Sequence, residues 1–65
     1  MNAADIFTPA YGYLLAHGKK ATIKQMAQDT GISENRLSKL MQNPSKATVL
    51  ELEALTTTYH YTISI

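Results

Sequence analysis

A single glycine interrupts the most regular stretch of this sequence and constrains its fold more than any other residue. The segments 23–28 (IKQMAQ) and 36–41 (RLSKLM) both have the composition of helices, and only seven residues separate them. Gly31 can adopt the positive φ that a sharp helix exit requires. Ser33 is a favourable N-cap for a helix that follows. The sequence therefore predicts two short helices that meet at a tight corner, the second spanning 34–42.

The rest of the composition describes one small globular domain covering residues 1–65. The chain is 45% hydrophobic and 17% charged, and it contains no cysteine, so disulfides and thiolate metal sites are excluded. A domain of this size is marginally stable by itself, and we therefore expect a second copy of the chain to stabilise it. There is no signal-peptide pattern and no apolar run of ~18 residues, so we expect a cytoplasmic protein.

Capping signals predict a helix on each side of this corner. Thr8-Pro9 has the form of an N-cap followed by proline at the first helical position, and Gly18 is suited to the left-handed stop. Whether residues 3–7 extend this helix or form a separate arm stays open. After a loop at 43–45, a helix is expected at about 47–58, with a possible capping box at Thr48 and Glu51 and with apolar residues at helical spacing, Val49, Leu52, Leu55 and Tyr59.

The two helices of the corner have apolar and polar faces of their own. A capping box at Thr22 and Gln25 opens the first, which we expect to run to about Asp29. The residues expected to face the core are Ile23, Met26 and Ala27 in the first helix and Leu37, Leu40 and Met41 in the second.

The last seven residues, 59–65 (YHYTISI), alternate between apolar and polar, which is the period of a strand. A lone strand leaves its backbone groups unpaired. We expect it to pair, over about 60–65, with the same strand of a second copy about a two-fold axis. A frayed tail, or a strand packed on its own helices, is the alternative. The predicted dimerisation residues are Tyr59, Tyr61, Ile63 and Ile65.

The corner has the spacing of a helix-turn-helix. Ala27 allows close approach of the helices, Gly31 makes the turn, and apolar residues anchor the second helix from below: Ile32, Leu37 and Leu40. This arrangement leaves the polar face of the second helix free to enter a DNA major groove. A plain helical hairpin is the alternative.

Residues 22–43 (TIKQMAQDTGISENRLSKLMQN) resemble the Cro/CI-type (XRE) helix-turn-helix family without a gap. Residues 43–65 are similar to the HipB-type antitoxins within it, and Phe7-Thr8-Pro9 resembles the opening of that group. The resemblance implies an all-α, lambda-repressor-like bundle of four to five short helices, with the helix-turn-helix at about 22–42 and a short C-terminal β-strand pairing across a dimer. The sequence departs from the family at Ile23, where a glutamine usually contacts a phosphate; that contact is missing, or Lys24 supplies it.

The resemblance also implies roles for individual residues. It places five residues at base edges or adjacent phosphates, Ser33, Glu34, Asn35, Ser38 and Lys39, with Arg36 flanking them. From their chemistry we expect base contacts from Glu34, Asn35, Ser38 and Lys39, and DNA-backbone contacts from Thr22, Lys24, Ser33, Arg36, Gln42 and Lys46. Asn35 can pair with adenine, Lys39 can donate to guanine, and Glu34 can accept from cytosine. Glu34 is explained equally well as a carboxylate that complements the helix dipole.

The distribution of charge favours a polyanionic partner. The net charge is only +1, but all six basic residues lie within 19–46, where only two acidic residues accompany them. An ordinary solvated surface is the alternative. His17 and His60 are the only histidines. Neither has a ligand cluster around it, and no nucleophile with its base is recognisable, so we expect no metal, no cofactor and no enzymatic activity.

The sequence thus predicts a dimeric, sequence-specific DNA-binding transcriptional repressor acting on an inverted-repeat operator, with half-sites roughly 34 Å apart. The HipB-like part implies the antitoxin of a bacterial toxin–antitoxin operon that represses its own promoter and binds a HipA-like kinase toxin. Two alternatives stay open: a phage or plasmid Cro-like regulator without a toxin, and a protein-interaction module that has lost DNA binding, which the low net charge and Ile23 favour.

Overall fold

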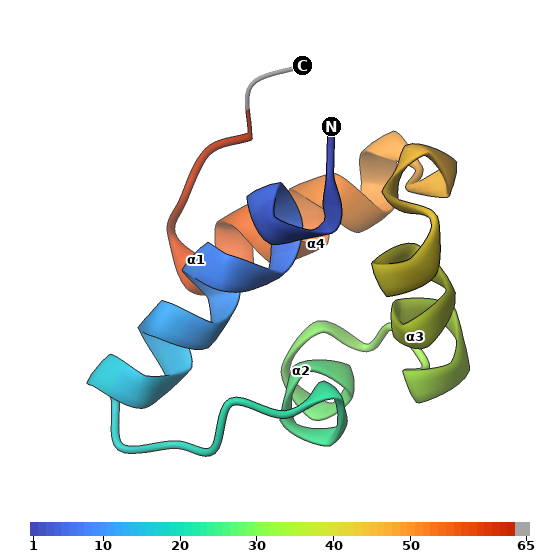
Figure 1. Cartoon of the computed structure of the whole chain (residues 1–65). Coiled ribbons are helices and arrows are strands. Elements are labelled where there is room, and N and C mark those ends of the chain that lie inside the picture. Colours follow the sequence, from blue (N-terminus) through green and yellow to red (C-terminus); the bar gives the residue numbers. More distant parts are fainter. Residues whose placement is uncertain (64–65) are drawn as a thin grey trace.

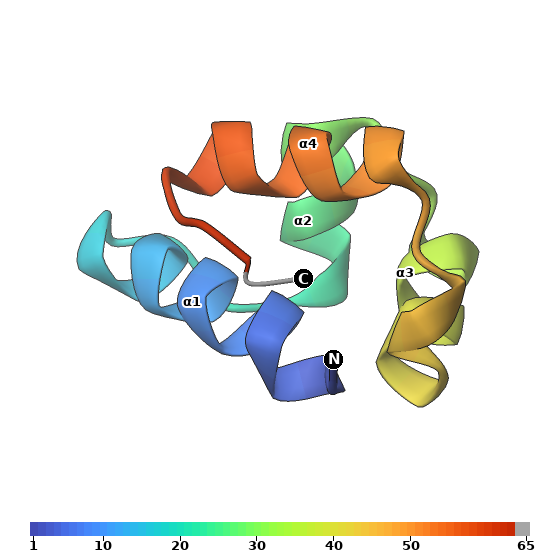
Figure 2. The same ribbon diagram turned by 90° about the horizontal axis from the view of Figure 1, so that it is seen from above.

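The computed structural model describes residues 1–63, and within them the fold is all-α (Figure 1). The helices are α1 (Ala3–Ala16), α2 (Ile23–Thr30), α3 (Glu34–Gln42) and α4 (Val49–Tyr59), with a 3-10 turn, η1 (Pro44–Lys46), before α4. In Figures 1 and 2, α1 and α4 lie side by side, and α3 lies at the edge of the molecule. None of the helices in residues 1–63 is long and apolar enough to cross a membrane.

Helix α1 begins earlier than the sequence predicts. Asn2 is its N-cap: the side chain of Asn2 accepts a hydrogen bond from the Asp5 amide (3.2 Å), and the Asp5 carboxylate accepts one from the Asn2 amide (2.9 Å). The prediction that Thr8-Pro9 starts the helix is therefore wrong, because a complete capping box lies upstream. Pro9 is inside the helix, and residues 3–7 extend it.

The end of α1 confirms the predicted glycine stop. Gly18 has a φ of 71°, its amide donates to the carbonyl of Leu15, and the Lys19 amide donates to the carbonyl of Leu14 at 2.9 Å. This pair of bonds is a Schellman motif, which satisfies carbonyl groups that a helix end otherwise leaves unpaired.

Of the two predicted capping boxes, the structure contains one. At α4, the Thr48 hydroxyl accepts from the Glu51 amide and the Glu51 carboxylate accepts from the Thr48 amide. At α2, Thr22 caps the helix by accepting from the Gln25 amide, but the Gln25 side chain donates to Asp29 one turn along (2.9 Å) instead of returning to Thr22. The box at Thr22 and Gln25 is thus half correct.

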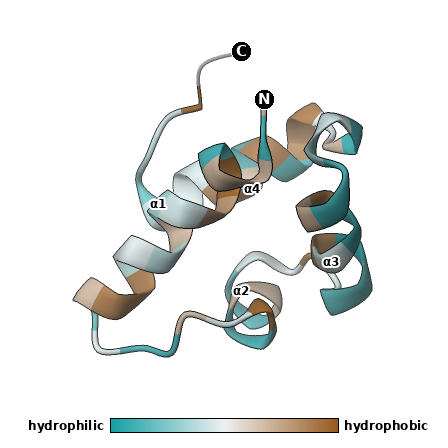
Figure 3. Cartoon of the chain, in the orientation of Figure 1, coloured by the Kyte–Doolittle hydropathy of each residue, from teal (hydrophilic) through white to brown (hydrophobic). Residues whose placement is uncertain are grey.

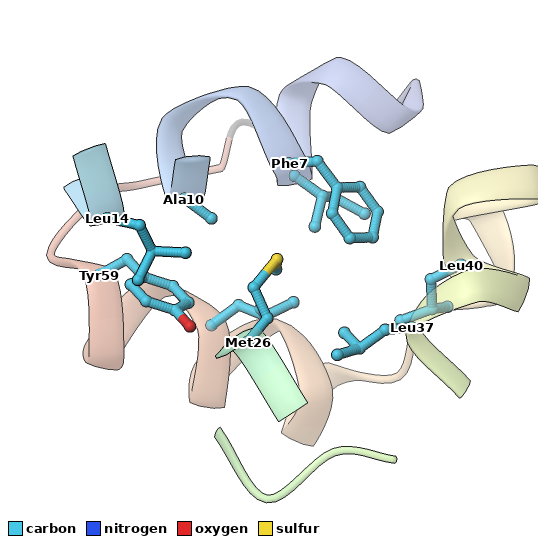
Figure 4. Packing of buried hydrophobic residues seen from close by; sticks show 9 residues of the cluster. Phe7, Ala10, Leu14, Met26, Leu37, Leu40 and Tyr59 are labelled. Carbon is cyan, nitrogen blue, oxygen red and sulfur yellow. The ribbon is translucent and has the colours of Figure 1, made fainter. Parts of the chain in front are cut away.

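The core lies where all four helices meet (Figure 4). Its buried members are Ile6, Phe7, Ala10, Leu14, Met26, Leu37, Leu40, Leu55 and Tyr59. The predicted inward residues Ile23 and Ala27 pack against this cluster and are partly buried. The prediction that Met41 faces the core is wrong: Met41, in the last turn of α3, is exposed. Val49, the first residue of α4, is 69% exposed, whereas Leu52 packs against the core.

The predicted C-terminal strand is absent from the part of it that the structure describes. Tyr59 ends α4, His60 has a left-handed backbone (φ 53°), and the amide of Tyr61 donates back to the carbonyl of Thr56. The Tyr61 hydroxyl then donates to the carbonyl of Ile6 in α1 at 2.8 Å. This segment therefore packs on the chain's own helices. The part of the prediction at residues 64–65 lies outside the described residues.

Candidate nucleic-acid interface

The corner between α2 and α3 is a tight turn closed by several hydrogen bonds. Gly31 has φ 78° and ψ 3°, and its amide donates to the carbonyl of Ala27. The Thr30 hydroxyl donates to the carbonyl of Met26 (2.7 Å) and accepts from the Ile32 amide (3.2 Å). Ser33 then caps α3, accepting from the Arg36 amide at 3.1 Å. The predicted turn glycine, the Ser33 cap and the bounds 34–42 are all confirmed.

Helix α3 has one buried side and one exposed side. Leu37 and Leu40 are completely buried and hold the helix against the core. The predicted base-reading residues Glu34, Asn35, Ser38 and Lys39 are all exposed. Figure 3 shows hydrophilic residues on the side of α3 that faces away from α1 and α4.

The exposed side presents a continuous polar row. Asn35, Ser38, Lys39 and Gln42 follow one another at the helical spacing that aligns side chains on one face. Among residues 1–63, no hydrogen bond or ion pair engages the side chains of Asn35, Ser38 or Lys39. Their polar groups are therefore available to hydrogen-bond an external partner. The edge of a base pair, which presents donors and acceptors, is such a partner.

The residues predicted to contact the DNA backbone are exposed and, within residues 1–63, free of internal ion pairs, with one exception. Thr22, Lys24, Ser33, Gln42 and Lys46 are exposed. Thr22 and Ser33 lie at the N-termini of α2 and α3, where unpaired amides and the helix dipole favour a phosphate. Ile23 packs against the core and is partly buried, whereas its neighbour Lys24 is exposed. Of the two, Lys24 is the residue that can reach a phosphate.

Arg36 is the exception, because its guanidinium is engaged within the chain. Its Nε donates to Glu51 Oε2 at 2.7 Å and its Nη2 to Glu51 Oε1 at 2.9 Å. Nη2 also donates to the backbone carbonyl of Lys46 at 2.7 Å. The hydrogen bond from Arg36 lowers the pKa of Glu51 to about 2, and bonds from Thr48 act in the same direction.

At the carboxyl end of α3, an open depression has a basic lining. It is formed by Arg36, Lys39, Gln42, Asn43 and Lys46. Because the Arg36 charge is paired with Glu51, the two lysines supply the positive charge there. The depression adjoins the polar row through Lys39 and Gln42.

A second polar centre that sequence reasoning missed holds α2 in place. The Tyr59 hydroxyl donates to Asp29 Oδ2 (3.1 Å), and Gln25 donates to Asp29 Oδ1. Lys19 Nζ approaches the same oxygen at 3.8 Å. Burial, followed by the hydrogen bond to Asp29, raises the pKa of Tyr59. Asp29 thus joins α2 to α4 and to the loop that precedes α2.

The predicted dimerisation residues make contacts within their own chain, to different extents. Tyr59 is 2% exposed and belongs to the core, and Tyr61 is bonded to α1. Ile63 is half-buried, and Ile65 lies outside the described residues. Tyr59 therefore offers no free surface to a second copy in this conformation.

The two histidines have structural surroundings. His17 Nδ1 donates to the carbonyl of Tyr13 at 2.8 Å, and the two rings stack. His60 follows α4 as its C-cap. Within residues 1–63, no group of three potential metal ligands comes together.

The fold, the turn and the free polar face of α3 together define a helix-turn-helix DNA-binding domain. Comparison with protein families matches residues 13–63 to the Cro/C1-type HTH DNA-binding domain. The chain belongs to this family, whose members are typically non-enzymatic regulators. Comparisons with curated proteins and with solved structures found no match.

Proposed function

We propose that this chain is a sequence-specific transcriptional repressor that inserts the exposed face of α3 into the DNA major groove. The observation that carries the proposal is that Leu37 and Leu40 are buried on one side of α3, while the polar row of Asn35, Ser38 and Lys39 stands free on the other. Bidentate donors and acceptors of this kind discriminate base pairs in the major groove.

Asn35 and Lys39 are the residues we assign to base recognition, with Ser38 between them and Glu34 at the start of the helix. Asn35 pairs with an adenine edge and Lys39 donates to a guanine. Glu34, the first residue of α3, accepts from a cytosine amine. The phosphates flanking these bases meet Thr22 and Ser33 at the two helix N-termini.

The repressor is proposed to act as a homodimer on an inverted repeat. One α3 covers only a few base pairs, so two copies reading half-sites roughly 34 Å apart are needed for a specific operator. Two copies bound side by side also repeat every phosphate contact, which strengthens binding and makes it steeper in salt.

The antitoxin role is the finer part of the proposal, and its support is the similarity of residues 43–65 to HipB-type antitoxins. An antitoxin of that kind binds a HipA-like kinase toxin and represses the promoter of both genes. Co-expression with a kinase-like neighbouring gene tests this role: the chain rescues growth and co-purifies with the kinase. Operator binding with no such rescue leaves a Cro-like regulator.

The DNA-binding proposal is tested by selecting duplexes from random DNA with the full chain. An inverted repeat should be enriched, and its affinity should fall steeply with salt, with log K decreasing by about 0.9 per log unit of salt for each phosphate contact. Asn35→Ala and Lys39→Ala should each weaken binding by roughly 5- to 150-fold and relax the preference at one position.

A matched control for these variants is Thr57→Ala, since Thr57 is exposed on α4 and is not among the predicted DNA contacts. It should bind the selected duplex as the wild type does. If no sequence is enriched, or if all three variants bind alike, the chain is an interaction module and the proposal is wrong.

A further inference from the structure

Arg36 connects three elements at the start of the DNA-reading helix. It belongs to α3, its two bonds to Glu51 reach α4, and its third bond reaches Lys46 in η1. Of the hydrogen bonds formed within residues 1–63, those of Arg36 are the ones that join α3 to α4. The two bonds to one carboxylate have the parallel, bidentate form that fixes orientation as well as distance.

We infer that the Arg36–Glu51 pair sets the orientation of α3 toward DNA, and that Arg36 is a positioning residue and not a phosphate ligand. The inference rests on the proposed function, since it says how the reading helix is held. It replaces the contact with the DNA backbone that the sequence predicts for Arg36.

Helix α3 needs such a restraint. It is nine residues long and is held from below by Leu37 and Leu40. Buried leucines fix which side of a helix faces the core, but their contacts are non-directional, so they define the exact rotation about the helix axis less sharply than a bidentate hydrogen bond does. Arg36 is next to Asn35, so a bidentate bond at its tip fixes the rotation of the residues that face the bases.

The Glu51 carboxylate is also held by a hydrogen bond that does not involve Arg36. Glu51 lies in the first turn of α4, where its Oε1 accepts from the Thr48 amide at 2.9 Å. The Glu51 side chain is 16% exposed. If Arg36 turned away to a phosphate, Glu51 would lose both hydrogen bonds from the guanidinium and the Lys46 carbonyl would lose its bond as well. The pair therefore stays closed when DNA is bound.

Glu51→Gln tests the inference, because it keeps the Arg36 charge and an acceptor for Thr48. If the Arg36–Glu51 pair positions α3, Glu51→Gln should weaken binding to the selected duplex by roughly tenfold, the effect of one misaligned base contact. Binding to unrelated duplex and the slope of log K against log salt stay unchanged. If Arg36 is instead a phosphate ligand, Glu51→Gln would release it from Glu51. Affinity for the selected duplex and for unrelated duplex would then stay equal to that of the wild type or rise, and that result overturns the inference.

Arg36→Lys is the complementary variant. Lysine remains a phosphate binder as a point charge but cannot make the bidentate bond. Positioning predicts a loss of operator affinity of similar size to that of Glu51→Gln, and a double variant that loses no more than either single one. An affinity equal to that of the wild type would overturn the inference.

Lys46→Gln provides the matched control for a phosphate contact, and its salt slope should fall by about 0.9. Amide NMR shifts of the free chain give a test that needs no DNA. Glu51→Gln should move the signals of Asn35, Ser38 and Lys39. Shifts confined to residues 48–52 would refute positioning, whereas failure of the wild type to select any sequence would refute the proposed function alone.

Discussion

Replacing Gly31 by alanine tests whether the corner depends on its left-handed backbone. An added Cβ at Gly31 would meet no atom within 4 Å, so no steric clash contributes. What remains is the backbone energy of an L-residue held at φ 78°, which is about 1–2 kcal/mol. In a domain of this size, each kcal/mol corresponds to a change of roughly 4–8 °C in the midpoint of thermal unfolding.

The chain contains matched controls for this substitution. Gly18 has a φ of 71° and equally open surroundings, so Gly18→Ala should lower the free energy of unfolding by a similar amount. Gly12 lies within α1, also with nothing within 4 Å, and Gly12→Ala should raise it by about 1 kcal/mol. Asparagine tolerates the left-handed region, so Gly31→Asn should lose less than Gly31→Ala.

The assay is urea unfolding followed by circular dichroism, with operator binding measured on the same samples. We expect Gly31→Ala and Gly18→Ala to be destabilised alike, but operator affinity to fall further for Gly31→Ala, because only that glycine lies between the two helices of the corner. Equal stability of Gly31→Ala and the wild type would refute the argument from backbone conformation.

Two other predictions concern the polar contacts between helices. Tyr59→Phe should lower the free energy of unfolding by about 1.5–3 kcal/mol, because the hydrogen bond from its hydroxyl to the Asp29 carboxylate is lost. Urea unfolding measures this effect, with Tyr13→Phe as the control. Equal effects of the two variants would contradict the role of Asp29. The pKa of Glu51 is lowered to about 2 by Arg36, so its contribution to stability is present above the unfolded value near 4.5 and is lost as pH falls toward 2. Between those pH values the stability of Glu51→Gln should decrease less than that of the wild type, and parallel curves would refute the assignment.

The parts of the site that sequence predicts well are those built from neighbouring residues. The Ser33 cap, the glycine turn and the Thr48–Glu51 box each close hydrogen bonds between residues no more than four apart. Residue type and spacing are enough to identify such bonds. The bounds of α3 and the exposure of Asn35 and Lys39 follow from them together with the apolar spacing of that helix.

The parts that sequence reasoning missed depend on partners far along the chain. The sequence predicts a phosphate contact for Arg36 and does not reveal its pairing with Glu51, because Glu51 is 15 residues away. Tyr59 finds Asp29 at a separation of 30 residues. The alternating pattern after Tyr59 indicated a strand, but packing against α1 overrides a local β preference. These pairings follow from how the helices meet, which spacing alone does not determine.

The bond between the Tyr61 hydroxyl and the Ile6 carbonyl has a mechanical consequence. It joins residues 55 apart, close to the two limits of the described chain, and so closes the domain into a loop. A force that pulls on both ends of the domain acts first on this hydrogen bond, because the bond links the two ends directly. The interior contacts among α2, α3 and the rest of the bundle carry the force only after the bond breaks. The tail after α4 should therefore detach first under tension, before the corner between α2 and α3 is disturbed.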